Sequence, residues 1–387
     1  MRVTEATRPV APASAPRVPA HDKLGRLVAR SLGLDEPALR EGLRPATLDD
    51  LPDVLALRRE HLLPGHEWDD DAYLRWRYRL GREGAGFGEL WCLRAHGRVL
   101  ATIGVEDLPI ELDGQPLTGA QVMDLLVRPE AQESGLGIWL NQAMLARHPF
   151  TLAVGANSNS AGIVRRLFEP LAPRLTFTHP LDLGPFVRRR WPTLAATPLA
   201  MRAANAGLAL RRLALRWRRP RGFMVEHTTR LDPTLAAPVP RGAASVHLRH
   251  HGAYLQRRLL DNPRRPLGLR VARRGDAVAG LIAWSVEADD LGRPELHLID
   301  WRHDGDDALL VLLHEALREA AAQGCTCVRL LLQDEASQRV AARAGFLPSS
   351  DDEGRPCGVQ SRDAELAARL AHAPWALTDL HDDADGF

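Results

Sequence analysis

A glycine-containing loop between an expected strand and an expected helix is the segment best suited to chemistry. The strand is expected at Gln121 to Val127, and the loop after it leads through Gly135 and Gly137 into a helix expected at Ile138 to His148. The start of such a helix presents backbone N–H groups and the positive end of the helix dipole to an anion. Because glycine has no Cβ, the main chain there can approach a bulky phosphate closely. The segment therefore predicts a site for a phosphate-bearing ligand.

Gly135 and Gly137 would also fit a tight strand-to-helix turn without a ligand, and this alternative stays open. Two further phosphate-binding motifs fit less well. A dinucleotide-binding unit should place its glycines after the first strand of its domain and an acid about twenty residues later, and a P-loop should end in Gly-Lys-Ser/Thr. The segment from Arg128 to Gly137 has neither feature.

The loop resembles the coenzyme A signature of the GNAT (Gcn5-related N-acetyltransferase) superfamily, because Gln132-x-x-Gly135-x-Gly137 fits that pattern fully. The resemblance implies that loop amides bind the pyrophosphate of acyl-coenzyme A and that the preceding strand end pairs with the pantetheine arm. Asn157 and Asn159 could contact pantetheine or only cap a helix. The cofactor-binding residues implied in this way are Leu126, Val127, Gln132, Glu133, Ser134, Gly135, Leu136, Gly137, Asn157 and Asn159.

Three acids are candidates for the catalytic base, which is needed because an alkyl amine with a pKa of about 10.4 is protonated at neutral pH. Asp124 lies on the strand that leads to the glycine loop, where enzymes of the superfamily often carry an acid facing the acceptor. Glu106 and Asp107 end the preceding expected strand. Each could instead be a solvated or structurally paired carboxylate. Phe168 stands where the superfamily usually has its general-acid tyrosine, and phenylalanine cannot donate a proton.

The order of elements in the first half recurs in the second, and such internal repeats decide architecture. Residues 72–78 are echoed by 253–259, the hairpin 97–101 by 275–279, and the strand with Asp124 by 296–301. The sequence therefore predicts an α/β (α+β) fold of two GNAT-like domains, each a mixed, mostly antiparallel sheet flanked by helices. In the second copy, Arg302 to Asp307 holds one glycine and three acids. Those acids would repel a polyphosphate, so this copy is expected to be degenerate.

The chain is expected to divide into five segments. Residues 1–42 form a disordered or loosely packed leader, 43–184 the acyl-CoA-binding domain, 185–223 an Arg-rich helical linker, 224–372 the degenerate domain and 373–387 an acidic tail. Within the linker, Arg188 to Arg221 holds ten arginines and no acid. A helix at Leu199 to Trp217 is too often interrupted by Arg to span a bilayer. We expect its arginines to be solvated, with weak membrane-surface contact as the alternative.

The amino-acid composition bears on the cellular compartment and on the classes of partner that can be expected. The formal net charge of +1 argues against a nucleic-acid partner. Four thinly spread cysteines and no apolar signal segment before them predict a reduced, cytoplasmic protein. No metal site is expected, because Cys325-Thr-Cys327 is too tightly spaced and His314-Glu315 lacks the second histidine of a zincin helix.

The function expected from these features is transfer of an acetyl or other acyl group from acyl-CoA. The acceptor would be an amine or hydroxyl of a small molecule, or of an envelope or polysaccharide precursor by analogy with tandem transferases. Two alternatives stay open: a non-catalytic tandem-GNAT binding or scaffold protein, and a Fem-like aminoacyl transferase. The glycine loop from Gln132 to Gly137 favours the acyl-CoA enzyme.

Overall fold

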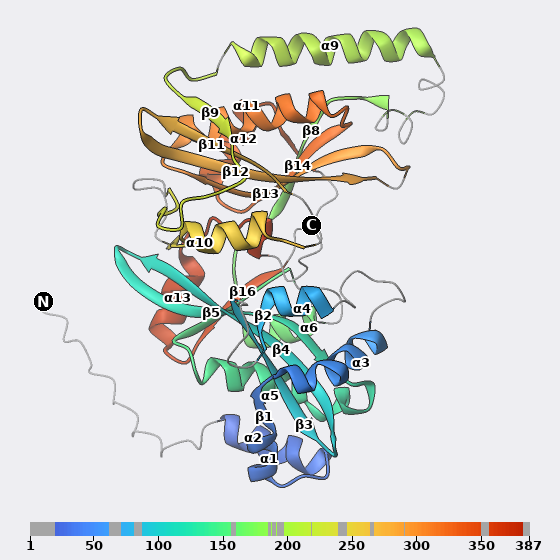
Figure 1. The fold of residues 1–387 in the computed structure, drawn as a ribbon, viewed down its shortest axis with the longest axis vertical. Helices are drawn as coiled ribbons and strands as arrows, with labels where there is room; N and C mark the ends of the chain where they lie inside the picture. The colour runs from blue at the N-terminus through green and yellow to red at the C-terminus, as the bar shows by residue number, and fades with distance from the viewer. Residues whose placement is uncertain are drawn as a thin grey trace, which may run out of the picture.

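Two β-sheets stacked along the long axis of the molecule form the framework of this computed structural model (Figure 1). The structure describes residues 20–61, 71–80, 87–155, 160–184, 187, 191, 197–217, 219–238, 246–263, 267–289, 291–349 and 356–381. Both sheets are mixed, mostly antiparallel and flanked by helices, which confirms the predicted fold class.

The first sheet has nine strands and is built around two tight hairpins. Its order is β1 (Leu43–Pro45), β3 (Gly88–Ala95), β4 (Arg98–Leu112), β5 (Gln115–Val127), β6 (Phe150–Val154), β16 (Cys357–Ser361) and β7 (Glu169–Pro170), with β2 (Tyr78–Arg79) beside β3 and β10 (Val246–Leu248) beside β4. The turns at His96-Gly97 and Asp113-Gly114 have positive φ at both residues. Such turns match the twist of antiparallel strands, so the long β3–β4–β5 meander follows from local sequence.

Helices cover both faces of this sheet. The buried residues of α3 (Leu51–His61) and α4 (Asp71–Arg77) pack on one face, together with Leu90, Cys92 and Val99. The other face packs against α1 (Ala20–Ser31), α2 (Glu36–Gly42) and α5 (Leu136–Leu145), while α6 (Ala161–Leu167) follows β6. Because successive side chains of a strand point to opposite faces of the sheet, alternate residues of β4 and β5 contact different helical layers.

The predicted loose leader is wrong for residues 20–42. Val28, Ala29 and Leu39 are buried in the same core as Trp139 of α5. Asp35 caps α2 by accepting a hydrogen bond from the Ala38 N–H at 2.7 Å. Leucine and valine at helical spacing in this segment form two packed helices that the prediction of a loose leader did not recognise. Residues 1–19 lie outside the described part of the chain.

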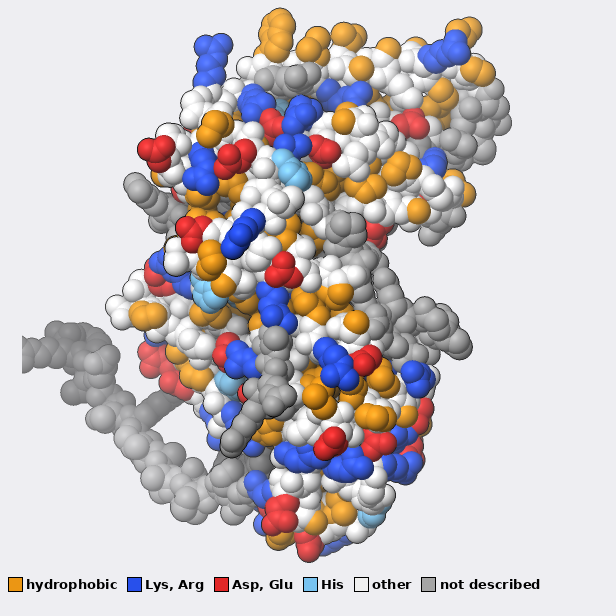
Figure 2. All heavy atoms as spheres, viewed as in Figure 1, with side chains coloured by type: hydrophobic (Ala, Val, Ile, Leu, Met, Phe, Trp, Pro, Cys, Tyr) orange, Lys and Arg blue, Asp and Glu red, His pale blue; other side chains and the backbone are white. Residues whose placement is uncertain are grey.

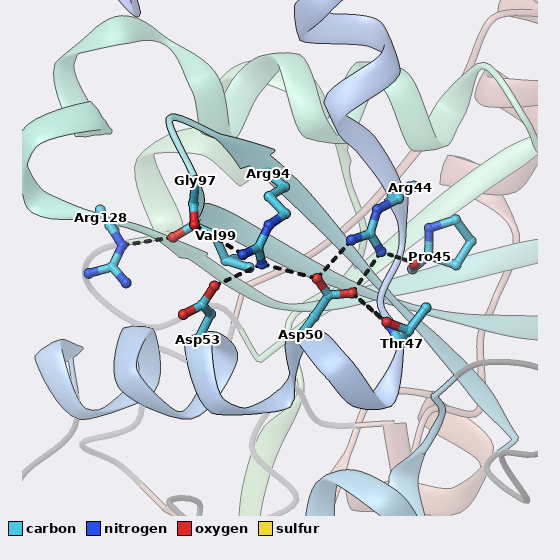
Figure 3. Close-up of polar contacts among 9 residues, drawn as sticks. All are labelled: Arg44, Pro45, Thr47, Asp50, Asp53, Arg94, Gly97, Val99 and Arg128. Atoms are coloured by element: carbon cyan, nitrogen blue, oxygen red, sulfur yellow. Dashed lines mark hydrogen bonds and ion pairs between the residues drawn. The ribbon is translucent and has the colours of Figure 1, made fainter.

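The beginning of α3 is fixed to the sheet by a cluster of charged side chains (Figure 3). The Asp50 carboxylate, at the end of the short 3-10 turn η1 (Leu48–Asp50), accepts hydrogen bonds from Arg44 at 2.7 and 2.8 Å, from the Thr47 N–H at 2.9 Å and from Arg94 at 3.2 Å. Burial acts to raise the pKa of Asp50, but hydrogen bonds from Arg44 and Thr47 lower it to about 2. This anchor sets the direction of α3, whose later turn carries Arg58 toward the centre of the sheet.

The second sheet has seven strands. Its order is β15 (Leu347–Pro348), β8 (Leu175–Pro180), β14 (Cys327–Leu332), β13 (Pro294–His303), β12 (Ala277–Ala288), β11 (Gly268–Arg274) and β9 (Met224–His227). One face packs against α11 (Asp306–Ala322) and α12 (Glu335–Arg343). The other face, turned toward the first sheet, packs against α10 (Gly252–Leu255), the π-helical turn η3 (Gln256–Leu260) and Leu380.

The halves exchange strands, so the sheets do not follow the predicted boundaries at 184 and 372. Strand β8, from the first half, lies between β14 and β15. In return β16, from the second half, lies between β6 and β7 of the first sheet and is covered by α13 (Ala364–His372). The internal repeat indicates the order of strands within each half. It does not show which strands of one half form hydrogen bonds with strands of the other half.

The predicted acidic tail is incorrect for residues 373–381. Trp375 is buried and packs edge-on against Phe150 of the first sheet, with ring centroids 6.4 Å apart. The turn η4 (Asp379–His381) is buried at Leu380 and His381 and contacts β13 of the second sheet. This segment thus fills space between the sheets; residues 382–387, which include the acidic run, lie outside the described residues.

The 19-residue helix α9 (Pro198–Arg216) lies across the end of the molecule beyond the second sheet (Figure 1). It falls within the segment predicted to be an Arg-rich helical linker. Among the helices that the structure describes, none is long and apolar enough to cross a membrane.

Candidate functional site

Strand β5 bends at Asp124, shortly before the glycine loop. Thr102 of β4 pairs with Leu126 and Gly104 pairs with Met123, so two residues of β5 face one residue of β4. Asp124 has a φ of 48°, a left-handed conformation that aspartate tolerates better than most residues. Such a bulge re-aims the side chains around it and is common beside functional sites.

A narrow apolar cleft opens where β5 and β6 part. These parallel strands pair at Ala120 with Thr151 and at Gln121 with Leu152, and both continue beyond those pairs. The cleft lies in the widening gap and is lined from β4, β5, β6, α5 and the start of α6. Its lining residues are Ile103, Val122, Met123, Leu125, Asn141, Ala153, Val154, Ser160, Ile163 and Val164.

The glycine loop has the predicted strand–turn–helix form. After the 3-10 turn η2 (Pro129–Ser134), Gly135 has a φ of 79° and α5 begins at the next residue. Gly135 is therefore required by its left-handed backbone. Gly137 is closely packed, because a Cβ there would lie 3.2 Å from Ile163 and 3.5 Å from Leu125 at the end of the cleft.

Two of the other predicted cofactor-binding residues, Gln132 and Ser134, hold the shape of the loop. Gln132 donates to the Val127 carbonyl at 3.1 Å, and the Ser134 hydroxyl accepts from the Leu136 N–H at 3.2 Å. Glu133 is exposed, Leu126 is half-buried on the α3 side, and Leu136 is buried. Asn157 and Asn159 lie outside the described residues.

The Asp124 carboxylate points to the opposite face of the sheet from the cleft and is engaged there. Tyr78 donates its hydroxyl hydrogen to Asp124, and Arg58 of α3 lies 3.6 Å away as an ion-pair partner. All three side chains are buried. The contact depends on Gly104, because a Cβ at that position would lie 2.3 Å from the Tyr78 hydroxyl.

Glu106 lies on the same face and forms a second buried pair. Arg77 approaches its carboxylate at 2.8 Å, and Tyr254, from the second half of the chain, donates its hydroxyl hydrogen to it. Two carboxylates, two guanidinium groups and two phenols are thereby gathered on one face of the sheet. Since an unpaired buried charge is costly, each carboxylate and its arginine stabilise one another.

Of the three predicted acids, the structure brings together only Glu106 and Asp124. Asp107 is exposed, and strand alternation turns it to the other face of β4. Sequence reasoning missed the partners of the two buried acids, because Arg58, Arg77, Tyr78 and Tyr254 come from separate segments. In the described part of the chain, no group of His, Cys, Asp or Glu is placed to hold a metal ion.

A line of buried polar side chains extends from Tyr254 into the second half. His250 stacks on the Tyr254 ring with centroids 4.1 Å apart, and its Nε2 lies 3.2 Å from Nε2 of His381. The line continues through Thr378, which donates to Asp300 at 2.6 Å. These contacts tie the face that carries Glu106 to strand β13 of the second sheet.

Burial keeps the phenols protonated and the imidazoles neutral. It raises the pKa of Tyr78 well above 10, and it also raises the pKa of Tyr254, so both hydroxyls act as donors. Burial, together with nearby Arg302, lowers the pKa of His250 and of His381 well below 6.5. The junction between the halves therefore carries uncharged histidines at neutral pH.

The free energy of unfolding should fall as pH drops below 6.5. His250 and His381 stay neutral when folded but take up protons near pH 6.5 when unfolded. The unfolded state then binds more protons, so stability rises with pH in this window and is lost as pH falls through it. Each histidine should contribute about 1.4 kcal/mol per pH unit.

Denaturant unfolding at several pH values between about 6 and 5 measures this slope. Replacing one imidazole, as in His250→Gln, should reduce the slope by about 1.4 kcal/mol per pH unit. An unchanged slope would show that His250 gains its proton in the folded protein at little cost.

Comparisons with known proteins support the fold of this chain but no particular activity. No protein-family model and no curated protein matches the sequence. A GCN5-related N-acetyltransferase structure from Anabaena variabilis ATCC 29413 has a TM-score of 0.53 at 13% identity, covering 82% of this chain and 71% of that chain. The chain therefore has a fold similar to that of a GCN5-related N-acetyltransferase, in line with the predicted resemblance.

Two further solved structures score slightly lower. One is a GCN5-related N-acetyltransferase from Kribbella flavida, with a TM-score of 0.49, 16% identity, and coverage of 85% of this chain and 72% of that chain. The other is N-myristoyltransferase from Saccharomyces cerevisiae with bound myristoyl-CoA, with a TM-score of 0.47, 11% identity, and coverage of 82% and 77%.

Proposed function

We propose that this chain is a tandem GNAT-type acyltransferase that moves an acetyl or other acyl group from acyl-CoA to an amine or hydroxyl. The observation that supports the proposal is that three features occur together along β5 and the loop that follows it. Strand β5 bulges at Asp124, parts from β6 after Gln121, and runs into a loop in which Gly135 is left-handed. The signature Gln132-x-x-Gly135-x-Gly137 lies in that loop.

The residues present fit acyl-CoA as a co-substrate. The pyrophosphate would meet backbone N–H groups of the loop between Gln132 and Gly137, where the helix dipole of α5 favours negative charge. The pantetheine arm would enter at the apolar cleft between β5 and β6, where the edge of β5 past Gln121 offers it backbone groups. The thioester would then lie beside the bulge.

The acceptor would approach from the face that carries the two buried acids. Its nitrogen attacks the thioester carbonyl carbon, the C–S bond breaks, and coenzyme A leaves as the thiolate. We assign the proton released by the amine to Asp124, with Tyr78 and Arg58 orienting the carboxylate. Glu106 and Asp107 are the alternative bases. Phe168 is buried, so its position supplies no general acid.

The second half is proposed to contribute to the acceptor side without binding coenzyme A. Tyr254 reaches Glu106 from that half. At the start of α11, Gly305 has an extended φ of 168°, and Asp306 and Asp307 occupy the first turn. Two carboxylates there oppose a polyphosphate. We propose a small-molecule acceptor as the partner and not a nucleic acid, on the ground of the net charge of +1, together with the cytoplasmic setting expected above.

Release of the coenzyme A thiol tests this function. The protein would be incubated with acetyl-CoA, with longer acyl-CoAs, and with a panel of primary amines and alcohols. Acceptor-dependent thiol release is the expected result. Binding of acyl-CoA with no release for any acceptor class would favour a non-catalytic binding or scaffold protein.

A further inference from the structure

The outward side of α9 is a continuous apolar stripe. Leu199, Leu210 and Trp217 follow one another at helical spacing and expose 75%, 68% and 85% of their surfaces. Leu213, at the edge of the stripe, exposes 48% and also lines the cavity between α9 and α11. Alanines 203, 206 and 214 fill the same side of the helix and are also exposed. Figure 2 shows hydrophobic side chains gathered along this end of the molecule.

The opposite side of α9 is the one that holds the helix on the protein. Asn205 accepts from the Leu183 N–H at 2.9 Å and donates to Asp182 at 2.7 Å. Nearer the end of the helix, Arg211 donates to the Gly345 carbonyl at 3.3 Å. Just after it, Arg219 pairs with Glu315 of α11 at 2.7 Å. The helix is therefore fixed with Leu199, Leu210 and Trp217 outward, while Leu208 and Leu215 are half-buried and Leu215 lies near Gly345 on the protein side.

The arginines of this segment, predicted to be solvated, differ in their surroundings. Arg212 is half-buried and lines a cavity between α9 and α11, together with His314 and Leu317. Arg202 and Arg211 are exposed and lie on the two flanks of the stripe. Because Arg202 and Arg211 are exposed and α9 itself contains no acid, positive charge borders the stripe in the part of the chain that the structure describes.

We propose that α9 binds the surface of a bilayer that contains anionic lipids. The 19 residues of α9 give a straight apolar stripe about 28 Å long, and it lies across one end of the molecule where nothing described projects beyond it (Figure 1). A helix of this kind inserts its apolar side into the headgroup region while flanking arginines pair with lipid phosphates. Charge complementarity is the reason for choosing an anionic membrane over a protein partner.

The membrane surface and the acyl-transfer site lie at opposite ends of the molecule. α9 lies beyond the second sheet, whereas α5 and the glycine loop belong to the first (Figure 1). Membrane binding therefore goes beyond the proposed acyltransferase function and does not depend on it. Variants in the stripe should leave acyl-CoA binding unchanged.

Co-sedimentation of the full-length protein with vesicles tests the proposal. Vesicles of phosphatidylcholine alone would be compared with vesicles that also contain phosphatidylserine. We expect binding only to the second kind, decreasing as salt screens the charges. Leu210→Gln with Leu213→Gln keeps good helix formers and should weaken binding at least about tenfold. Arg202→Gln alone should weaken it about fivefold.

The matched control is Leu291→Gln with Leu347→Gln. These leucines are exposed to 68% and 49%, much like Leu210 and Leu213, but lie outside α9. This variant should bind vesicles as the wild type does. The proposal is overturned by no binding to anionic vesicles, by equal binding to both kinds, or by equal loss in the control. It is also overturned if the α9 leucines instead hold two copies of the chain together, which light scattering would show.

Discussion

Gly135→Val is expected to weaken acetyl-CoA binding by about 100-fold or more. Gly135 has a φ of 79°, and a β-branched residue in that region costs about 1–3 kcal/mol or displaces the loop. Its Cβ would lie 3.6 Å from Leu24 and 3.9 Å from Val28 of α1, so the branches of a valine would also crowd α1 and displace the loop. Calorimetric titration measures the loss of affinity, and thermal unfolding measures the loss of stability.

A matched glycine separates the loss of binding from simple backbone strain. Gly114, in the turn between β4 and β5, has the same φ of 79°, and a Cβ there would contact nothing within 4 Å. Gly114→Val should therefore lower stability to a similar extent while leaving acetyl-CoA affinity unchanged. Equal loss of affinity in both variants would contradict a specific role for Gly135.

Asp124→Asn is expected to lower the turnover rate about 100- to 10,000-fold while acetyl-CoA affinity stays near that of the wild type. The amide cannot accept the proton from the attacking amine. Stability should fall as well, because Arg58 is buried and loses its charged partner. Breaking a buried pair in this way costs up to about 3–5 kcal/mol. The rate must therefore be expressed per folded molecule.

Asp50→Asn provides the control for the stability effect. Asp50 is also buried and pairs with Arg44, but it lies at the other end of α3 from Arg58. Its replacement should lower stability without changing the rate per folded molecule. If Asp124→Asn behaves in the same way, Asp124 is a structural carboxylate, and the base is Glu106, Asp107 or a bound water.

Features encoded by neighbouring residues could be predicted from the sequence. A turn such as His96-Gly97 needs left-handed backbone, and only a few residue types supply it, so the hairpin that contains Gly97 was expected. The strand–loop–helix around Gly135 was expected for the same reason. The stretch 121–127 and the glycines after it thus define the candidate acyl-CoA site locally.

Features that depend on distant segments could not be predicted. The exchange of β8 and β16 between the sheets requires knowing which strands become neighbours, and a repeat in sequence does not contain that information. The same holds for Tyr254, which reaches Glu106 across 148 positions of chain. In α9 the arginines and leucines were visible, but which side of the helix faces the protein depends on Asn205 and its distant partners.

Stoichiometry of acetyl-CoA binding tests the central claim most directly. We expect one molecule per chain, lost in Gly135→Val and kept in Gly305→Val, because Gly305 is extended and a Cβ there would contact nothing within 4 Å. A stoichiometry near two, or binding that survives Gly135→Val and disappears with Gly305→Val, would contradict the assignment of the site to the first half. No binding of acetyl-CoA or longer acyl-CoAs to the wild type would contradict the acyltransferase proposal itself.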